Sequence, residues 1–578
     1  MTEKNSEIFK LLLKLFNKFK KSRQRQIIVL FFLILLSAFA ELVSLLSVFP
    51  FLELISKSGS INEINFLKNL FYILGLSTEN NVFLAVTVIF SLTAIISAII
   101  KTLNLWYGNR LSASLGTDLS CECFRRNIYQ EYLQFIGNNS SKLIANNSIY
   151  INEVTDALGI AARFFTALIL SIFISLFLLL FNFFTSLFAI IIFLLTYFLI
   201  AKFSKGKLSR NSYLITNNAR KQVQLMKETN GSFRDVILGS NQKEYLDFYK
   251  KLDYQKRISQ AQNNFIYLFP RNSIESLLLV FLALLTYLIS INSSTASLVI
   301  PTVGTLAVGA QKLLPYMQQA YGSWSSLIGS SASIMHVLQM LDIPIKDVSY
   351  KNKNHKIILK NYISAEGLSL KYENKNPYVF EDINFKINKG EIFGIVGKSG
   401  SGKSSLADIL MGLIKPTNGF LKVDGINIYD ENYPSRYIEW RNSITHVPQN
   451  IFLIDSTILE NIAFTNKKNH IDFGKAIKAA KDANIHSFIS QLPNGYMTIV
   501  GEDGVKLSGG QRQRIGIARA LYKDCEILFF DEATSSLDIA TENKILQTIF
   551  NLRGKKTIFI ISHRLNSLKK CDRLIQFS

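Results

Sequence analysis

The chain has 578 residues, which is too many for one hydrophobic core and predicts several domains. Its formal net charge is +22, and 48% of its residues are hydrophobic. The apolar residues gather in long runs between positions 27 and 316, which excludes a chain made only of soluble domains.

The positive charge has two possible meanings. A basic chain can bind nucleic acid, or it can carry lysine and arginine in the cytoplasmic loops of a membrane protein. The basic residues crowd the N-terminus and the segment after the fourth apolar stretch, and no basic groove interleaved with aromatic residues is visible. We therefore favour membrane topology and expect no nucleic-acid partner.

Residues 1–26 form a basic segment that we expect to lie in the cytoplasm. Apolar stretches follow it, and a membrane-spanning helix needs about 20 such residues. The candidate spans are Ile27–Phe51, Val82–Leu103, a block from Phe164 to Phe203, Ile266–Ile291 and Ala296–Tyr316. The block is too long for one span, so we expect it to fold back near Asn182, which gives six spans.

An even number of spans places both ends of the chain on the cytoplasmic side. The long polar segments 104–162 and 204–265 then also lie in the cytoplasm, as extensions of the membrane helices. The predicted transmembrane domain covers residues 27–345. We expect the four cysteines to be free thiols, because their spacing fits no CxxC motif.

A polar linker over residues 346–356 ends the membrane part. Alternating apolar residues resume at Ile357–Leu370 and predict a strand. Strands, a glycine-rich loop and helices then follow one another up to residue 578. This order predicts a parallel α/β nucleotide-binding domain over residues 357–578.

A complete Walker A pattern, GxxxxGK[ST], covers Gly397–Ser404. An apolar strand pattern precedes it and a helix pattern follows it, and this context supports phosphate binding. The glycines allow backbone N–H groups to surround phosphate at a helix N-terminus. Lys403 is expected to pair with the β- and γ-phosphates of ATP, and Ser404 to bind Mg²⁺. A glycine loop of this length and context rarely arises by chance.

Two carboxylates, Asp531 and Glu532, follow the apolar run Ile527–Phe530. A buried strand delivers such residues to the carboxyl edge of a parallel sheet, which makes a pair of solvated surface acids the weaker interpretation. We expect Asp531 to hold Mg²⁺ and Glu532 to orient or deprotonate the attacking water.

Leu507–Gln511, with the sequence LSGGQ, completes a resemblance to ATP-binding cassette (ABC) transporters. Further family elements occur in the expected order. Tyr372 resembles the aromatic residue that stacks on adenine, and Gln449 resembles the Q-loop glutamine. Ser535–Asp538 resembles the D-loop, and His563 resembles the switch histidine near the γ-phosphate.

This resemblance implies a site built from two cassettes packed head to tail. Glu532, His563 and Gln449 would be catalytic, and Mg²⁺ would be held by Ser404, Gln449 and Asp531. ATP would contact the following residues of the two cassettes: Tyr372, Gly397, Ser399, Gly400, Ser401, Gly402, Lys403, Ser404 and Ser405 of one, and Ser508, Gly509, Gly510 and Gln511 of the other.

One chain carries one cassette, so a second copy is expected. A homodimer is the simplest way to provide the second cassette, and a heterodimer with a homologue is an alternative. Six spans followed by one cassette resemble a half-size exporter, and Glu502 resembles a residue that contacts the cytoplasmic extensions of exporter helices. The chain ends soon after the switch histidine, whereas family members usually continue through another strand and a helix, so we expect the edge of the cassette to be less stable here.

The membrane half says less about the cargo. Glu41 lies inside the first span, and such a charge usually faces a cavity or a partner. Other charges lie near the cytoplasmic ends of spans, where snorkelling to the interface is an equally good explanation for each one. As a set they suit a phosphate-bearing lipid. These residues are Lys101, Arg163, Arg271, Glu275 and Lys312.

The segment Ala40–Leu52 also resembles the first span of bacterial flippases for lipid-linked oligosaccharides and of polysaccharide exporters. We therefore expect a multi-pass protein of the bacterial inner membrane that moves an amphipathic, lipid-linked substrate outward. A drug or peptide exporter is the alternative. An ABC ATPase that does not transport is a third possibility, against which the six spans argue.

Overall fold

The computed structural model divides into two compact units, Met1–Lys346 and Asp347–Ser578, which are described separately. The residues whose structure it describes are 8–48, 50–52, 79–137, 149–181, 183–292, 296–345, 355–372, 377–398, 400–433, 435–465, 470–533, 539–564 and 568–577.

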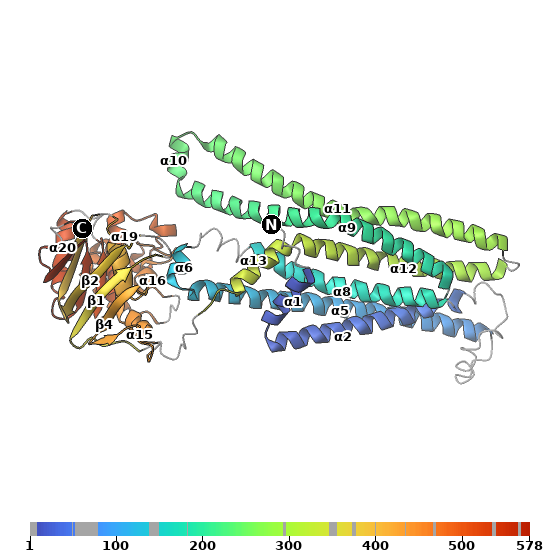
Figure 1. Cartoon of the computed structure of the whole chain (residues 1–578), viewed down its shortest axis with the longest axis horizontal. Coiled ribbons are helices and arrows are strands. Elements are labelled where there is room, and N and C mark those ends of the chain that lie inside the picture. The colour runs from blue at the N-terminus through green and yellow to red at the C-terminus, as the bar shows by residue number, and fades with distance from the viewer. Residues whose placement is uncertain are drawn as a thin grey trace. The chain divides into compact units, whose positions relative to one another are not determined.

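The first unit is helical throughout its described residues (Figure 1). Its helices are α1 (Ile8–Lys18), α2 (Lys21–Leu46), α5 (Glu79–Tyr129), α6 (Tyr132–Gly137), α8 (Ile151–Phe181), α9 (Phe183–Gly231), α10 (Phe233–Leu238), α11 (Gln242–Asn292), α12 (Ala296–Gly329) and α13 (Ser331–Leu341). Single helices α5, α9 and α11 continue from apolar stretches into polar ones, as the predicted cytoplasmic extensions require.

Four helices of the described part are long and apolar enough to cross a membrane: Lys21–Leu52, Phe83–Tyr129, Ile151–Leu180 and Ser186–Gly231. The last two predicted spans fall within α11 and α12, so the expected count of six stays a prediction. The predicted fold-back falls between α8 and α9, although Asn182 itself lies outside the described residues.

Pairs of long helices form the core of this unit. Helix α8 packs along α12, α9 along α11, and α2 along α5 (Figure 1). The seams are apolar, and the outer faces keep many large apolar side chains exposed, as on α5 at Leu92, Ile95 and Ile99. Outward-facing apolar helices without a protein neighbour match a lipid environment.

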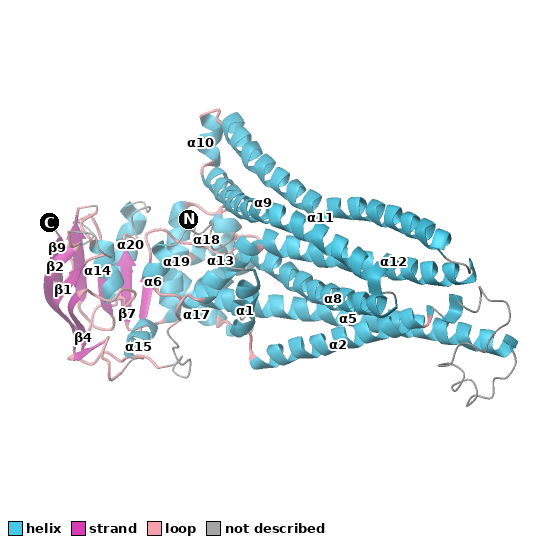
Figure 2. Cartoon of the chain, turned by 45° about the vertical axis from the view of Figure 1, so that its right-hand side comes forward, coloured by secondary structure: helices cyan, strands magenta, loops and turns pink. Residues whose placement is uncertain are grey.

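The second unit contains all the strands of the described residues, drawn in magenta in Figure 2. An antiparallel sheet has the order β2-β1-β4-β5, and a parallel sheet has the order β6-β7-β8-β3-β9. The strands are β1 (Tyr362–Leu370), β2 (Phe380–Asn388), β3 (Ile392–Gly397), β4 (Asn418–Val423), β5 (Ile426–Asn427), β6 (Ile444–Val447), β7 (Ile527–Asp531), β8 (Thr557–Ile561) and β9 (Arg573–Phe577).

Short helices complete this unit. They are α14 (Lys403–Leu410), α15 (Arg436–Asn442), α16 (Ile458–Ala463), α17 (Phe473–Asp482), α18 (His486–Gln491), α19 (Gly509–Lys523) and α20 (Ile539–Phe550). The central strands are apolar because both faces are covered: β7 and β8 pair in parallel, and Phe529 stacks on Phe559 between them. The predicted combination of a helical membrane-type domain and an α/β domain is thereby confirmed.

Two details differ from the sequence expectations. The strand predicted from Ile357 begins only at Tyr362, because the backbone N–H groups of Lys360, Asn361 and Tyr362 donate to the Asp424 carboxylate. At the other end of the cassette, the further strand that was expected to be missing after His563 is present. It is β9, which pairs in parallel with β3.

Candidate active site

The predicted functional residues follow four neighbouring strands of the parallel sheet. Gln449 comes two residues after β6, Glu532 directly after β7, His563 two residues after β8, and the glycine-rich loop directly after β3. The carboxyl ends of parallel strands meet at one edge of a sheet, where ligands commonly bind. The strand order therefore places residues that are more than 160 positions apart, such as Gly397 and His563, at the ends of neighbouring strands.

The Glu532 carboxylate is the meeting point of the three residues predicted to be catalytic. Gln449 Nε2 donates a hydrogen bond to Glu532 Oε2 at 2.8 Å. His563 Nδ1 lies 3.1 Å from Glu532 Oε1. The carboxylate thus has one polar neighbour on each oxygen, and its own position is fixed by both.

The backbone of Glu532 is also unusual. Its φ is 46°, in the left-handed region that a residue with a side chain rarely adopts. Its N–H donates to Ile561 O at 3.0 Å, which ties the turn after β7 to the end of β8. The strained turn aims the carboxylate along the sheet edge.

The glycine-rich loop connects β3 to α14. Gly400 and Gly402 have φ values of 82° and 98°, which glycine adopts without strain. Lys403 begins α14, and its Nζ donates to the carbonyl oxygens of Gly397 and Lys398 at 2.8 and 2.6 Å. Of the predicted loop residues, Ser399 lies outside the described part.

The loop fits an anionic ligand. The buried Ser401 hydroxyl has no hydrogen-bond partner among the described residues. A Cβ at Gly397 would lie 2.7 Å from Phe577 and 2.8 Å from Ser401 Oγ, so only glycine leaves the loop its shape. Ser404 is exposed in the first turn of α14, where the helix dipole favours negative charge.

The carboxylates beside this loop fit a divalent cation. Burial, and next the charge of Glu532, raise the pKa of Asp531. Burial and the charge of Asp531 raise the pKa of Asp408 on α14 to about 6. A cation here would stabilise both ionised forms, and magnesium in phosphate sites needs only one or two protein carboxylates.

Tyr372 lies beside the first turn of α14. Its phenol oxygen is 2.9 Å from Ser405 Oγ, and the residue is 38% exposed. The structure therefore places two predicted nucleotide-binding residues together, next to the loop, with part of the tyrosine ring accessible to a ligand.

The predicted signature residues start helix α19. Ser508 is its N-cap: Gln511 N donates to Ser508 Oγ at 3.3 Å, and Ser508 N donates to Gln511 Oε1 at 2.8 Å. This reciprocal pair is a capping box. Ser508 and Gly509 are exposed, Gly510 is half-buried, and no hydrogen bond among the described residues joins this segment to the glycine-rich loop of the same chain.

Sequence reasoning missed two features of this helix. The capping box was visible as the pattern Ser-x-x-Gln before an apolar-periodic run. Gln513 is 3% exposed, and its Nε2 approaches Glu532 O at 3.5 Å, which links α19 to the turn after β7. No local pattern marks that residue, because its partner lies on a strand that only the fold brings near.

The two remaining elements predicted from the sequence are the segment Ser535–Asp538 and Glu502. Ser535–Asp538 lies outside the described residues. Glu502 begins a short 3₁₀ turn, Glu502–Gly504, and is exposed, while Arg512 Nη1 donates to the neighbouring Asp503 O at 3.3 Å. The role expected for Glu502 stays a prediction.

In the first unit, Glu41 finds the partners that a charge inside a span requires. It is 2% exposed on α2, and Ser97 Oγ donates to its Oε2 at 2.6 Å. Lys101 Nζ lies 2.6 Å from the same oxygen, and Lys312 Nζ lies 3.1 Å from Oε1. The separate pair Arg271 and Glu275 is 3.8 Å apart on the exposed side of α11 and belongs to no such cluster.

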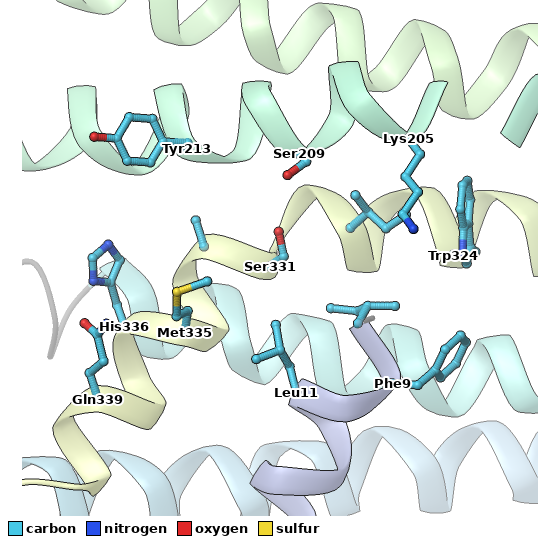
Figure 3. Close-up of a pocket in the computed structure, with 13 residues that line it drawn as sticks. Phe9, Leu11, Lys205, Ser209, Tyr213, Trp324, Ser331, Met335, His336 and Gln339 are labelled. Carbon is cyan, nitrogen blue, oxygen red and sulfur yellow. The ribbon is translucent and has the colours of Figure 1, made fainter. Parts of the chain in front are cut away.

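Two cavities within the described part of this unit bear on the position of a ligand site. One, of about 290 Å³, lies between α1, α9, α12 and α13, with Lys205 and His336 among its polar groups (Figure 3). The other, of about 150 Å³, is lined by α2, α5, α8 and α12 and includes Lys101 and Arg163.

Comparison with known proteins supports the interpretation of the second unit. Residues 380–535 match the family model described as ABC transporter. An ATP-dependent lipid A-core flippase of Coxiella burnetii is 40% identical over 242 residues, which are 42% of this chain and 40% of that protein. A putative multidrug export ATP-binding/permease protein of Bacillus subtilis is 35% identical over 281 residues, 47% of each chain.

A leukotoxin translocation ATP-binding protein of Mannheimia haemolytica is 39% identical over 254 residues, 44% of this chain and 34% of that protein. The chain thus covers less than half the length of these relatives. A solved structure of a bacterial Atm1-family ABC exporter with ATP bound shares the fold over 96% of this chain and 94% of its own, with a TM-score of 0.75 and 19% identity.

Proposed function

The second unit contains an ABC transporter domain, and we propose that the whole chain is one half of an ATP-driven exporter. Its proposed parts are the basic segment 1–26, a transmembrane domain over 27–345 with six spans, a linker over 346–356 and a cassette over 357–578. The apolar outer faces of the long helices and the exporter fold of the whole chain support this assignment.

One observation carries the proposed ATPase: Gln449 and His563 both contact the Glu532 carboxylate, at the sheet edge that also holds the glycine-rich loop. Glu532 serves as the base that accepts a proton from the attacking water. His563 and Gln449 hold that carboxylate in place. The resulting ATPase uses Mg²⁺, which neutralises phosphate charge when bound.

Residues on three sides would hold the nucleotide. Lys403 exchanges the carbonyls of Gly397 and Lys398 for phosphate oxygens, and Ser404 and Asp531 lie where they can bind the cation with help from Gln449. Tyr372 offers its accessible ring to the base. The loop N–H groups at the start of α14 complete the phosphate site.

The signature segment supports a site shared between two copies. Ser508, Gly509 and Gly510 lie at the N-terminus of α19, where exposed backbone N–H groups attract an anion. They make no hydrogen bond with the loop of their own chain within the described part. A second copy of the chain supplies the opposite half of each site, and a homologous chain could take its place.

For the cargo we favour an amphipathic, lipid-linked oligosaccharide or a related lipid, moved outward from the cytoplasmic side of a bacterial inner membrane. The charge cluster at Glu41 and the polar cavity beside it support an amphipathic substrate over a wholly apolar one. The names of the relatives include lipid, drug and toxin export, so a drug or peptide remains the alternative cargo.

Reconstitution in liposomes tests this function. Purified protein is supplied with lipid-linked sugars, drugs or peptides, and both ATP hydrolysis and outward movement are measured. We expect a lipid-linked sugar to stimulate hydrolysis and to cross the bilayer. If a drug does so and the lipid-linked sugar does not, the lipid assignment is wrong while the exporter assignment stands.

A further inference from the structure

The smaller cavity of the membrane unit has an unusual lining. It measures about 150 Å³, and helices α5, α8 and α12 contribute Lys101, Asn104, Arg163 and Tyr316 to it. Drug-sized ligands occupy sites of roughly 300–1,000 Å³, so this cavity suits a small polar group. Lys101 and Arg163 stand at the ends of the apolar stretches predicted on α5 and α8, and Lys101 lies level with Glu41 of the first predicted span.

The environment of Arg163 points to an anionic ligand. It is half-buried on α8 and makes no hydrogen bond or ion pair with any residue that the structure describes. A guanidinium among membrane helices is costly without a counterion, and its planar fork matches phosphate oxygens. An anion in the cavity would satisfy it.

Asn104 supplies an independent sign. Its side chain is buried, with 5% of the residue exposed, and Nδ2 approaches Thr166 Oγ1 at 3.4 Å. Its Oδ1 has no hydrogen-bond partner in the described part of the chain. A buried polar atom without a partner costs about 1–3 kcal/mol, which a hydroxyl donor on the ligand would offset.

Lys101 connects the cavity to Glu41. Its Nζ is 2.6 Å from Glu41 Oε2 and 3.4 Å from the phenol oxygen of Tyr316, which also lines the cavity. Lys312 holds the other carboxylate oxygen. Within this described cluster, one carboxylate therefore faces two lysines, and Arg163 adds a third cation. The cluster carries a surplus of positive charge, with Glu41 acting as an internal anion that competes for Lys101.

From these contacts we propose that the cavity binds the phosphoryl headgroup of a lipid, with Arg163 and Lys101 on the phosphate and Asn104 on a hydroxyl of the headgroup. Leu30, Leu105 and Leu170 form the apolar part of the lining. This proposal rests on the proposed export function only for the direction of movement, because binding itself needs no turnover.

The test is calorimetric titration of the full chain in detergent, without nucleotide. The probes are a short-chain polyprenyl monophosphate, the matching polyprenol and inorganic phosphate. We expect the monophosphate to bind more tightly than the other two. Arg163→Gln should weaken monophosphate binding by about tenfold or more, because it removes a charge-assisted hydrogen bond.

Two matched variants locate the effect. Arg110→Gln removes an exposed arginine that stacks on Trp106, and Lys205→Gln removes the lysine of the larger cavity in Figure 3. Both should bind the monophosphate like the original protein. Glu41→Gln should tighten monophosphate binding and leave polyprenol unchanged, because it frees Lys101 and Lys312.

Equal affinity for monophosphate and polyprenol, or an Arg163→Gln variant that binds as tightly as the original, would overturn the proposal. Inorganic phosphate that binds as tightly as the lipid would overturn the lipid headgroup as the ligand. ATP hydrolysis by the same preparation separates the two failures: an active ATPase without monophosphate binding rejects this site and leaves the exporter function standing.

Discussion

At the scale of single residues, the molecule concentrates its chemistry on one strained position. Glu532 keeps a left-handed backbone, which costs on the order of 1–3 kcal/mol for such a residue, and both carboxylate oxygens have fixed neighbours. The proposed base stays aligned only if the turn after β7 stays intact. Gln513 contributes to that turn from the signature helix.

The first prediction concerns this base. Glu532→Gln should retain ATP binding and lower ATP hydrolysis by about 100-fold or more, because general-base catalysis contributes 10²–10⁴-fold. Lys403→Ala should instead weaken ATP binding itself. Hydrolysis is measured by phosphate release and binding by a fluorescent ATP analogue. Glu431→Gln, an exposed acid of the cassette, is the control, and unchanged hydrolysis in Glu532→Gln would refute the assignment.

The second prediction concerns pH. The folded cassette binds protons at Asp408 up to pH about 6, whereas the unfolded chain releases them near the ordinary value of 3.8. The contribution of Asp408 to the free energy of unfolding of nucleotide-free protein should therefore fall as pH rises from about 4 to 6, and the difference between the original protein and Asp408→Asn isolates it from the other titrating groups. Asp408→Asn should stabilise the cassette at pH 7.5 by about 1 kcal/mol, after allowance for solvent screening, and give no gain at pH 4.

The fluorescence of Trp440 reports on unfolding, because this residue is fully buried in the cassette. The other two tryptophans are replaced by phenylalanine so that only Trp440 contributes to the signal. Denaturant unfolding is then followed by its fluorescence at both pH values. A stabilisation of the same size at pH 4 and pH 7.5 would contradict the ionisation of Asp408 as its cause.

At the scale of elements, the sequence predicted the strands and helices whose ends are marked by local residue patterns. Strands β3 and β7 are apolar runs, one ending at a glycine-rich loop and the other at two acids. Helix α14 follows Gly402, and helix α19 begins with Gly509 after the N-cap Ser508. The start of β1 could not be predicted, since Asp424, more than 60 residues away, takes the backbone N–H groups of the preceding residues.

The residues of the candidate site were likewise predictable from local motifs, whereas their contacts were not. Each of Gln449, Glu532 and His563 was identifiable from its motif, yet their meeting at one carboxylate follows from the strand order β6-β7-β8. Gln513 and the internal neutralisation of Glu41 depend on contacts between distant elements, so no local pattern could show them. Charge inside a span indicated that Glu41 needs a partner but not which one.

A third prediction belongs to helix α19. Gln511→Ala should lower the free energy of unfolding of the cassette by about 1 kcal/mol, because it breaks the capping box with Ser508. Gln511→Glu restores the box and should recover that stability in the Trp440 assay. If Gln511→Glu is as unstable as Gln511→Ala, the side chain does not stabilise the helix through the cap.

At the scale of the whole molecule, the proposed ATP site requires two chains. The glycine-rich loop and the signature segment are each complete, but no described hydrogen bond joins them within one chain. In the proposed dimer, the exposed N–H groups at the start of α19 and the glycine-rich loop before α14 would form the two halves of an anion site. Pairing two copies makes two such sites.

The fourth prediction uses mixed dimers. Lys403→Ala damages the loop, and Ser508→Arg blocks the signature, so each variant alone should hydrolyse ATP very slowly. Coexpressed and purified as a mixed pair through two different tags, they form one dimer with one intact site, which should recover a substantial part of the activity. Full activity of the Ser508→Arg variant by itself would mean that each chain hydrolyses ATP alone and would contradict the shared site.

The most direct test of the account is whether nucleotide bound to the cassettes moves the membrane helices. Cys121 is exposed on α5 and can carry a spin label once Cys571 is replaced by serine, since the other two cysteines are buried. The distance between the two labels of a dimer is measured in bilayer nanodiscs with and without ATP and Mg²⁺. In the Glu532→Gln background we expect ATP to shift this distance to a new, single population, and Lys403→Ala to abolish the shift. An unchanged distance, with ATP binding demonstrated in the same sample, would contradict the coupling of ATP to transport.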